Sequence, residues 1–169
     1  RLLHVSLNGL RHRLGGSVFA QVHDELGDEC PDLDKPARLV SFAAALCTLR
    51  DAGHVLAYHD VSDGGLFATL AEMAFAGHCG LDVSLPGQDG TAVEQLFAEE
   101  PGVVLQVRAA ALEALRVTWR LHGLEHCVRE IGAPAADMRV RIDVGSAKLD
   151  LAWRELREAW SRTSFEMRR

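Results

Sequence analysis

Residues 59–66 read HDVSDGGL, so two carboxylates, a hydroxyl and two glycines directly follow the apolar run HVLAY. The Asp60 carboxylate suits Mg²⁺, because hard cations prefer oxygen ligands. The Ser62 hydroxyl can donate a hydrogen bond to a phosphate oxygen. Gly64 and Gly65 carry no Cβ, which lets the backbone turn sharply and approach a ligand closely. Together these residue types suit a site for a magnesium-bound phosphate.

The elements on either side of this stretch would position such a site. HVLAYH at 54–59 predicts a buried strand, and GLFATLAEMAFAG at 65–77 predicts an almost wholly apolar helix. Ligands of open α/β sheets bind at the carboxyl ends of strands, and helix starts favour anions. A second interpretation needs no ligand: Ser62 or Asp63 caps the helix and the glycines form a tight turn.

Strands alternate with helices along the rest of the chain, which predicts a layered α/β domain. HCVREI and MRVRIDV, separated by the turn GAPAAD, are expected to form an antiparallel hairpin, so the sheet is mixed. We expect HVLAYH at the centre of the sheet, with the helix at 65–77 buried against it. Caps are predicted at Ser17, at Asp34 and in a Thr91–Glu94 capping box. The predicted strands are 2–7, 54–59, 80–85, 102–108, 126–131 and 138–144, and the predicted helices are 17–26, 36–52, 65–77, 91–100, 109–122 and 151–167.

Composition excludes several classes of protein. The net charge is −6 with scattered basic residues, which argues against a nucleic-acid partner. No apolar run approaches the roughly 20 residues that cross a bilayer. The four cysteines form no CxxC pair and are interpreted as packing residues in a reduced, cytoplasmic protein. A zinc site at His122, His126 and Cys127 is rejected, because Gly123 breaks the helix and no second ligand pair is nearby.

Other polar and aromatic residues are given structural roles. By alternation His59 points away from Asp60 and is packed or at the surface. Thr69 and Glu72 are expected at the solvent edge of their helix, and Glu99 and Glu100 at a solvated helix end. Trp153 and Trp160 form an apolar stripe, and Gly15–Gly16 offers a weak anion-binding loop.

The segment AYHDVSDGGLFATLAEMAFAGHCGLDV resembles the hallmark stretch of the phosphoribosylformylglycinamidine synthase family, which are large purine-biosynthesis amidotransferases. LGGSVFAQV, LFAEEPGVVLQV and WRELREAWSRTSFEM are similar to the same family, in the same order along the chain. The sequence departs from the family at Pro101, which replaces an apolar residue, and in NGLRHR, an imperfect match to a glycine-rich loop.

The resemblance implies a fold: a mixed β-sheet layered with α-helices, like the C-terminal domain of aminoimidazole ribonucleotide synthase. Residues 1–169 would be one such subdomain, from the second synthase half of a longer chain. Residues 150–169 would form a helix leading toward a glutaminase domain. The partners would be that domain and the remaining synthase subdomains.

The resemblance also implies a function. The family converts formylglycinamide ribonucleotide, ATP and glutamine to formylglycinamidine ribonucleotide. Asp60 would ligate Mg²⁺, and Ser62, with Gly64 and Gly65, would bind an auxiliary ATP or ADP. No catalytic residue is expected within this chain, so alone it would be inactive. Two alternatives stay open: a related synthetase, such as aminoimidazole ribonucleotide synthase, selenophosphate synthetase or thiamine monophosphate kinase, and a non-catalytic assembly module.

Overall fold

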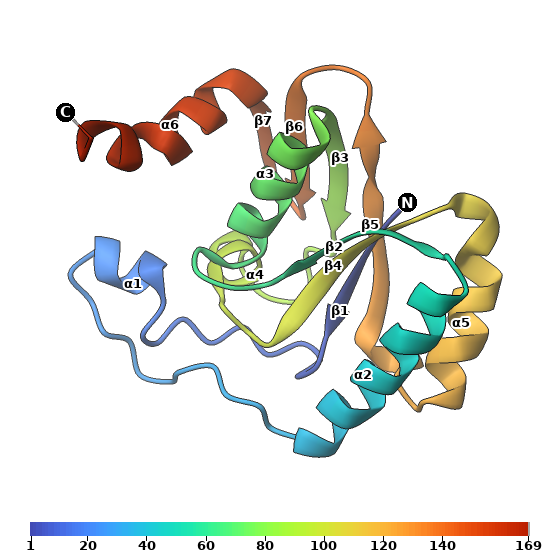
Figure 1. The fold of residues 1–169 in the computed structure, drawn as a ribbon. Helices are drawn as coiled ribbons and strands as arrows, with labels where there is room; N and C mark the ends of the chain where they lie inside the picture. The colour runs from blue at the N-terminus through green and yellow to red at the C-terminus, as the bar shows by residue number, and fades with distance from the viewer. Residues whose placement is uncertain (169) are drawn as a thin grey trace.

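A mixed sheet of seven strands, in the order β2-β4-β1-β5-β3-β6-β7, forms the centre of the protein (Figure 1). The computed structural model describes residues 1–168. Neighbouring strands are antiparallel except β3 and β6, which are parallel, so the predicted mixed sheet is confirmed. The strands are β1 (Leu2–Ser6), β2 (Val55–Asp60), β3 (Gly80–Leu85), β4 (Gly102–Val107), β5 (Val128–Ala135), β6 (Arg139–Val144) and β7 (Ala147–Ala152).

Helices cover both faces of the sheet. One face packs against α2 and α5, and the other against α3, α4 and α6. The helices are α1 (Val18–Val22), α2 (Pro36–Asp51), α3 (Gly65–Gly77), α4 (Ala92–Phe97), α5 (Leu112–Leu121) and α6 (Trp153–Glu166), with 3₁₀ turns at Ala109–Ala111 and Glu125–Cys127.

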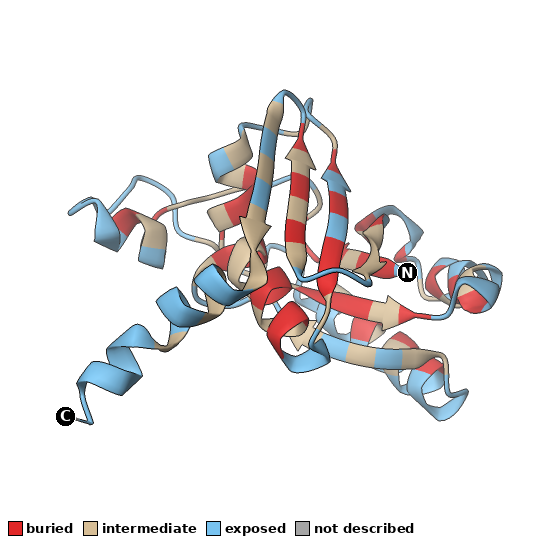
Figure 2. Cartoon of the chain, turned by 90° about the horizontal axis from the view of Figure 1, so that it is seen from above, coloured by how far each residue is buried: buried red, intermediate tan, exposed pale blue. Residues whose placement is uncertain are grey.

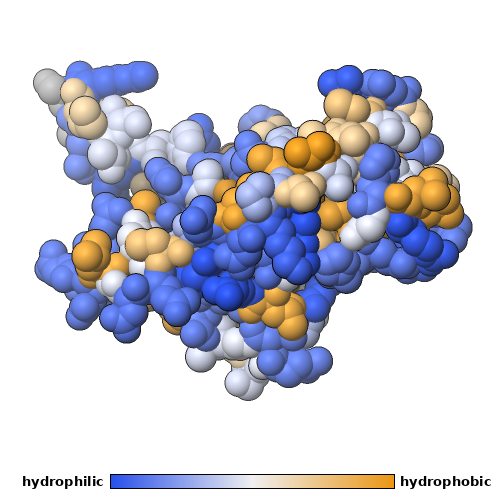
Figure 3. All heavy atoms as spheres, turned by 90° about the horizontal axis from the view of Figure 1, so that it is seen from below, coloured by the Kyte–Doolittle hydropathy of each residue, from blue (hydrophilic) through white to orange (hydrophobic). Residues whose placement is uncertain are grey.

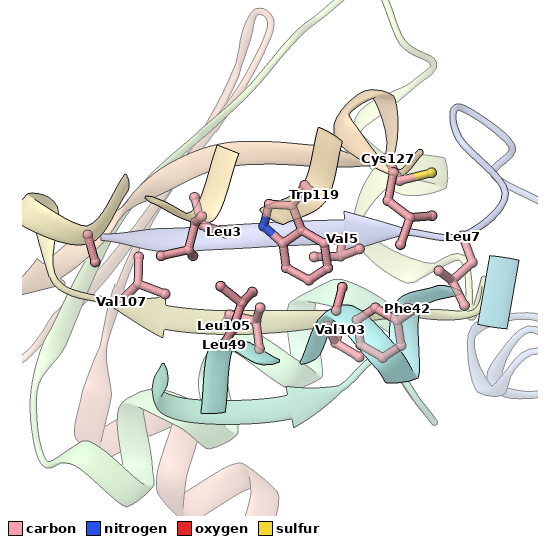
Figure 4. Close-up of a cluster of buried hydrophobic side chains, with 14 residues drawn as sticks. Leu3, Val5, Leu7, Phe42, Leu49, Val103, Leu105, Val107, Trp119 and Cys127 are labelled. Carbon is pink, nitrogen blue, oxygen red and sulfur yellow. The ribbon is translucent and has the colours of Figure 1, made fainter. Parts of the chain in front are cut away.

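The core under α2 and α5 is built on β1 and β4 (Figure 4). Trp119 of α5 is 1% exposed and stacks on Phe42 of α2, with ring planes 3° apart. Leu3 and Leu105 supply the sheet side of this contact. Burying a large apolar side chain contributes roughly 1.5–3 kcal/mol, so this cluster fixes α5 to the sheet.

The second core lies under α3, as the apolar character of residues 65–77 predicts. Leu66, Leu70 and Ala74 pack in one cluster with Val83 of β3 and Ile142 of β6. Each face of the sheet therefore has a core made from this chain's own residues.

Strand β5 joins two halves of the sheet, which differ in direction (Figure 2). Its first part pairs with β1 and its second part with β3, and Gly132 pairs with both Leu2 and Val83. A Cβ on Gly132 would lie 2.0 Å from the Asp82 carbonyl oxygen, so only glycine fits this close approach.

The expected hairpin of HCVREI and MRVRIDV is wrong, because β3 lies between β5 and β6. The expected turn at GAPAAD is mostly strand.

Strand β2 lies at the edge of the sheet, so its predicted central place is wrong. Its residues alternate between half-buried and exposed, and Leu56 is 45% exposed. Strand β7 was not predicted. It takes residues up to Ala152, and the last helix begins at Trp153 instead of residue 151.

Two predicted caps are confirmed and one is wrong. The Ser17 side chain caps α1, and Thr91 and Glu94 form the capping box of α4. Lys35 occupies the N-cap of α2 without a side-chain bond. Asp34 pairs with arginines of the loop after β1 instead.

Within residues 1–168, none of the helices has the length and apolar character needed to cross a membrane. The face seen from below carries several separate apolar patches amid mostly hydrophilic surface (Figure 3).

Candidate functional site

Asp60 ends β2, with its side chain exposed on the α2 side of the sheet. It lines a hollow of about 230 Å³ together with Tyr58, and with Leu39 and Phe42 of α2. The Tyr58 hydroxyl donates a hydrogen bond to the Asp60 carboxylate. Burial, and then this bond, raise the pKa of the Tyr58 hydroxyl, so it remains a donor at neutral pH. The Asp60 carboxylate is thus oriented by its neighbour and open to solvent.

His59 points to the opposite face, as the alternation of the strand predicts. Its Nε2 lies 2.8 Å from a carboxylate oxygen of Glu72 in α3. The Trp160 indole N–H donates to the other oxygen of Glu72 at 2.7 Å. These contacts fasten α6 and β2 to α3.

The placement of Thr69 at the solvent edge is wrong, since it is 1% exposed and its hydroxyl donates to the Asp60 and Gly65 carbonyls.

The turn after β2 has its shape because of its two glycines. Gly64 and Gly65 have φ values of +83° and +65°, which side chains rarely adopt. A Cβ on Gly65 would lie 2.7 Å from the Leu96 carbonyl oxygen, so the start of α3 packs directly against α4. The Gly65 N–H donates to the Ser62 carbonyl at 2.9 Å and closes the turn.

Neither Ser62 nor Asp63 caps α3. The N-cap is Gly64, and neither Ser62 nor Asp63 forms a side-chain cap bond to this helix. Both side chains are exposed. The helix-cap interpretation of these two residues is therefore wrong, and within residues 1–168 both side chains face solvent at the start of a helix.

Glu99 and Glu100, which sequence reasoning placed at a solvated helix end, are structural anchors. Helix α4 ends at Phe97. One carboxylate oxygen of Glu99 accepts hydrogen bonds from Gly64 N–H at 2.8 Å and Val18 N–H at 2.9 Å. The Gly64 amide thus has an acceptor within the chain.

The Glu100 carboxylate is buried beneath the loop that follows β1. It accepts bonds from the side chains of Asn8 and Arg13, the latter from Nε at 2.6 Å. Burial opposes ionisation of Glu100, but these bonds outweigh it and hold the pKa of its carboxyl below its usual value. The only signal in the sequence was a pair of glutamates directly before a predicted strand, and it did not identify their partners.

The donor set fits a hard cation only in part. Asp60, Ser62 and Asp63 offer oxygen atoms, which Mg²⁺ prefers. No group of three or more His, Cys, Asp or Glu side chains within residues 1–168 could hold a metal ion. Asp60 would thus be one ligand among several, the others coming from a nucleotide or another segment.

The glycine loop at residues 15–16 and the cysteines were also considered in the sequence analysis. The amides of Gly15 and Gly16 donate to the carbonyls of Glu29 and Leu26. Cys127 is buried, but Cys30 and Cys47 are exposed, so the packing role predicted for all four cysteines is wrong for these two.

The family model described as AIR synthase related protein, C-terminal domain, matches residues 1–145. Among solved structures, the chain is similar to Thermotoga maritima PurL, phosphoribosylformylglycinamidine synthase II. The structure of that protein complexed with FGAR matches this chain with a TM-score of 0.73 and 18% identity. The match covers 92% of this chain and 27% of the PurL chain. The structure complexed with ATP matches with a TM-score of 0.69 and 14% identity, and this match covers 92% of this chain and 25% of the PurL chain.

A second similar protein is Escherichia coli HypE, a hydrogenase maturation protein. Its TM-score is 0.58 at 23% identity, covering 90% of this chain and 49% of HypE. The chain therefore spans about a quarter of each PurL chain and about half of HypE. At these identities, the likeness to solved structures concerns the fold.

Proposed function

This chain belongs to the family of AIR synthase related C-terminal domains, and we propose that it forms part of a Mg²⁺–nucleotide site in a phosphoribosylformylglycinamidine synthase. Asp60 contributes one ligand to Mg²⁺, and Ser62 donates to a phosphate oxygen. Gly64 and Gly65 contribute the conformation of the backbone that the phosphates approach, since their own amides already bond to Glu99 and to the Ser62 carbonyl. The nucleotide is ATP or ADP, and Mg²⁺ supplies neutralisation of phosphate charge.

The observation that carries this proposal is that neither Ser62 nor Asp63 caps α3. Ser62 and Asp63 would be explained as caps if they bonded to the helix, but the N-cap is Gly64 without a side-chain bond. The backbone N–H groups at a helix N-terminus suit an anionic ligand, and the exposed Asp60 carboxylate beside them suits the cation that accompanies it. The motif HDVSDGGL supports the same assignment through its family resemblance.

The rest of the reaction belongs to other parts of the protein. The proposed reaction converts formylglycinamide ribonucleotide, ATP and glutamine to formylglycinamidine ribonucleotide. This chain contributes no catalytic residue to it, and its partners are the remaining synthase subdomains and a glutaminase domain. The likeness to PurL structures with ATP and with FGAR supports this choice of enzyme.

The test is the nucleotide content of the intact protein that carries this chain. Asp60→Asn keeps the size of the side chain but removes the charge that offsets Mg²⁺. We expect the purified variant to lose most of its bound ATP or ADP. Asp28→Asn, which removes an equal charge from an exposed position in the loop after α1, is the matched control and should keep it. Full occupancy in the Asp60→Asn protein would remove the metal-ligand assignment.

A second candidate is another ATP-using enzyme of the same family. The likeness of the fold to HypE, a hydrogenase maturation protein, supports it. Both candidates predict nucleotide binding, so the substrate separates them. Formation of formylglycinamidine ribonucleotide by the intact protein, with glutamine and ATP, supports the first candidate, and its absence from an active nucleotide-binding protein supports the second.

A further inference from the structure

Glu99 joins two segments that are far apart in the chain. A single oxygen of its carboxylate accepts from the backbone N–H groups of Gly64 and Val18, at 2.8 and 2.9 Å. Gly64 is the N-cap of α3 and Val18 is the first residue of α1. The bonds therefore connect the turn at residues 61–65 with the loop at residues 14–18.

The backbone that carries Glu99 is itself held in place. The next side chain, Glu100, is 6% exposed and bonds to Asn8 and Arg13. On the other side, Leu96 and Phe97 contact the backbone of Gly65 so closely that no Cβ would fit. Glu99 is thus fixed relative to both segments that it joins.

We propose that Glu99 is a positioning residue that holds the turn at 61–65 in the conformation that binds nucleotide phosphate. This inference rests on the proposed function. A carboxylate bonded to two backbone amides fixes both, because charge-assisted bonds are about twice as strong as neutral ones. Without Glu99, the Gly64 amide loses its acceptor and the turn is free to move away from the loop at 14–18.

The opposite role makes the opposite prediction. If the carboxylate instead occupied the place of a phosphate oxygen and had to leave on binding, removing it would tighten nucleotide binding. The contact with Val18 favours positioning, because a mere competitor at the start of α3 would need no bond to a second segment.

The first experiment follows the two amides by NMR in the 169-residue chain. In Glu99→Ala, the amide protons of Val18 and Gly64 should both shift and exchange faster with solvent. Glu99→Gln keeps an acceptor oxygen and should preserve most of their protection. Glu158→Ala, which removes an exposed carboxylate of α6, is the control and should change neither amide. Unchanged exchange at either amide in Glu99→Ala would overturn the two-segment contact.

The second experiment measures Mg-ADP affinity in the intact protein that carries the chain. Glu99→Ala should weaken binding about tenfold, the size of effect seen when a residue supporting a ligand shell is lost, and Glu99→Gln should restore most of it. A lower melting temperature with unchanged affinity would reduce Glu99 to a structural residue. Tighter binding by Glu99→Ala would reverse its role.

These outcomes separate the inference from the proposed function. If the unmodified protein binds no Mg-ADP, the proposed function and the nucleotide role of Glu99 both fail, while the NMR measurement still decides whether Glu99 holds the two segments together. If the unmodified protein binds and Glu99→Ala binds equally well, the proposed function stands and the positioning role fails.

Discussion

At the scale of single residues, the site consists of groups that are oriented by a neighbour. Tyr58 donates to Asp60, Glu99 accepts from Gly64, and Thr69 donates to the Asp60 carbonyl. Outer contacts of this kind fix the geometry of a ligand group, and their loss commonly weakens metal affinity by about 10–100-fold.

The bond from Tyr58 should therefore affect Mg²⁺ more than the nucleotide. In the intact protein, Tyr58→Phe keeps the ring but removes the donor to Asp60. We expect Mg²⁺-dependent ADP binding to weaken about tenfold, and binding without Mg²⁺ to stay unchanged. Titrations of ADP at several Mg²⁺ concentrations measure both. An equal loss with and without Mg²⁺ would place the effect in the fold instead of in the Asp60 carboxylate.

His4 should make the chain less stable in mild acid. Burial, with the nearby charges of His12 and Arg129, lowers the pKa of His4 to about 4. The unfolded chain takes up this proton at about pH 6.5, so the stability linked to neutral His4 is complete above that pH. It is lost as the pH falls from 6.5 toward 4, by about 1–3 kcal/mol in all.

Urea unfolding at pH 7.5 and pH 5 tests this. His4→Leu should flatten the loss between the two pH values, because no proton is then linked to unfolding at this position. His23→Gln changes an exposed histidine and is the control. The explanation fails if His4→Leu and the unmodified chain lose equal stability between pH 7.5 and pH 5.

At the scale of elements, the turn before α3 depends on its glycines and not on its polar side chains. Gly65→Ala places a side chain at a φ of +65° and 2.7 Å from the Leu96 carbonyl oxygen. We expect it to cost about 2–4 kcal/mol of unfolding free energy. Ser62→Ala and Asp63→Ala should each change it by less than about 0.5 kcal/mol, since neither caps the helix.

Gly53→Ala separates strain from overlap in this experiment. Gly53 has a φ of +69°, but a Cβ there would meet no atom within 4 Å. Its alanine variant should cost only about 1–2 kcal/mol, from the left-handed conformation alone. Equal losses of unfolding free energy for Gly53→Ala and Gly65→Ala in chemical denaturation would show that steric overlap with α4 does not restrict the turn.

Local patterns predicted most of the elements, because each pattern reflects local burial, but the helix expected at 17–26 ends at Val22 and β7 was missed. Residues 80–85 alternate and form β3 with those bounds, and the apolar stretch 65–77 forms α3. Strand order was less predictable, since β2 looks like a buried strand but pairs only with β4. Which strand is central depends on pairing between distant segments, and the local sequence HVLAYH does not determine that pairing.

Strand β5 and the glutamate pair show why the rest could not be predicted. GAPA contains glycine and proline, which favour turns, yet it continues β5 because β3 pairs with it up to Ala135. Pro134 costs no bond on the other side, since the pairing with β1 stops at Gly132. Glu99 and Glu100 looked solvated because their partners, Gly64, Val18, Asn8 and Arg13, lie in loops whose path depends on the whole fold.

At the scale of the whole molecule, the proposed function requires more than this chain. The chain spans about a quarter of each PurL chain, and Asp60 is the only Mg²⁺ ligand that we assign here. We expect the purified 169-residue chain to form no formylglycinamidine ribonucleotide, even with ATP, Mg²⁺ and an ammonium salt supplied. A chromatographic assay for the product tests this, with the intact protein as the positive control. Product from the chain alone would contradict the division of labour proposed above.

The position of β1 between β4 and β5 delays its pairing during synthesis. Leu3 pairs with Leu105 of β4 on one side and with Glu130 of β5 on the other. During synthesis, at about 5–20 residues per second, β1 waits on the order of 5–20 s before β4 has been made. In that interval its apolar residues Leu2, Leu3 and Val5 have no sheet to join, and such delayed long-range pairing slows folding and exposes the nascent chain to aggregation. Strand β1 can pair on both sides only after Gly132 of β5 has been made, so its place in the sheet is completed after β2, β3 and β4 have been synthesised.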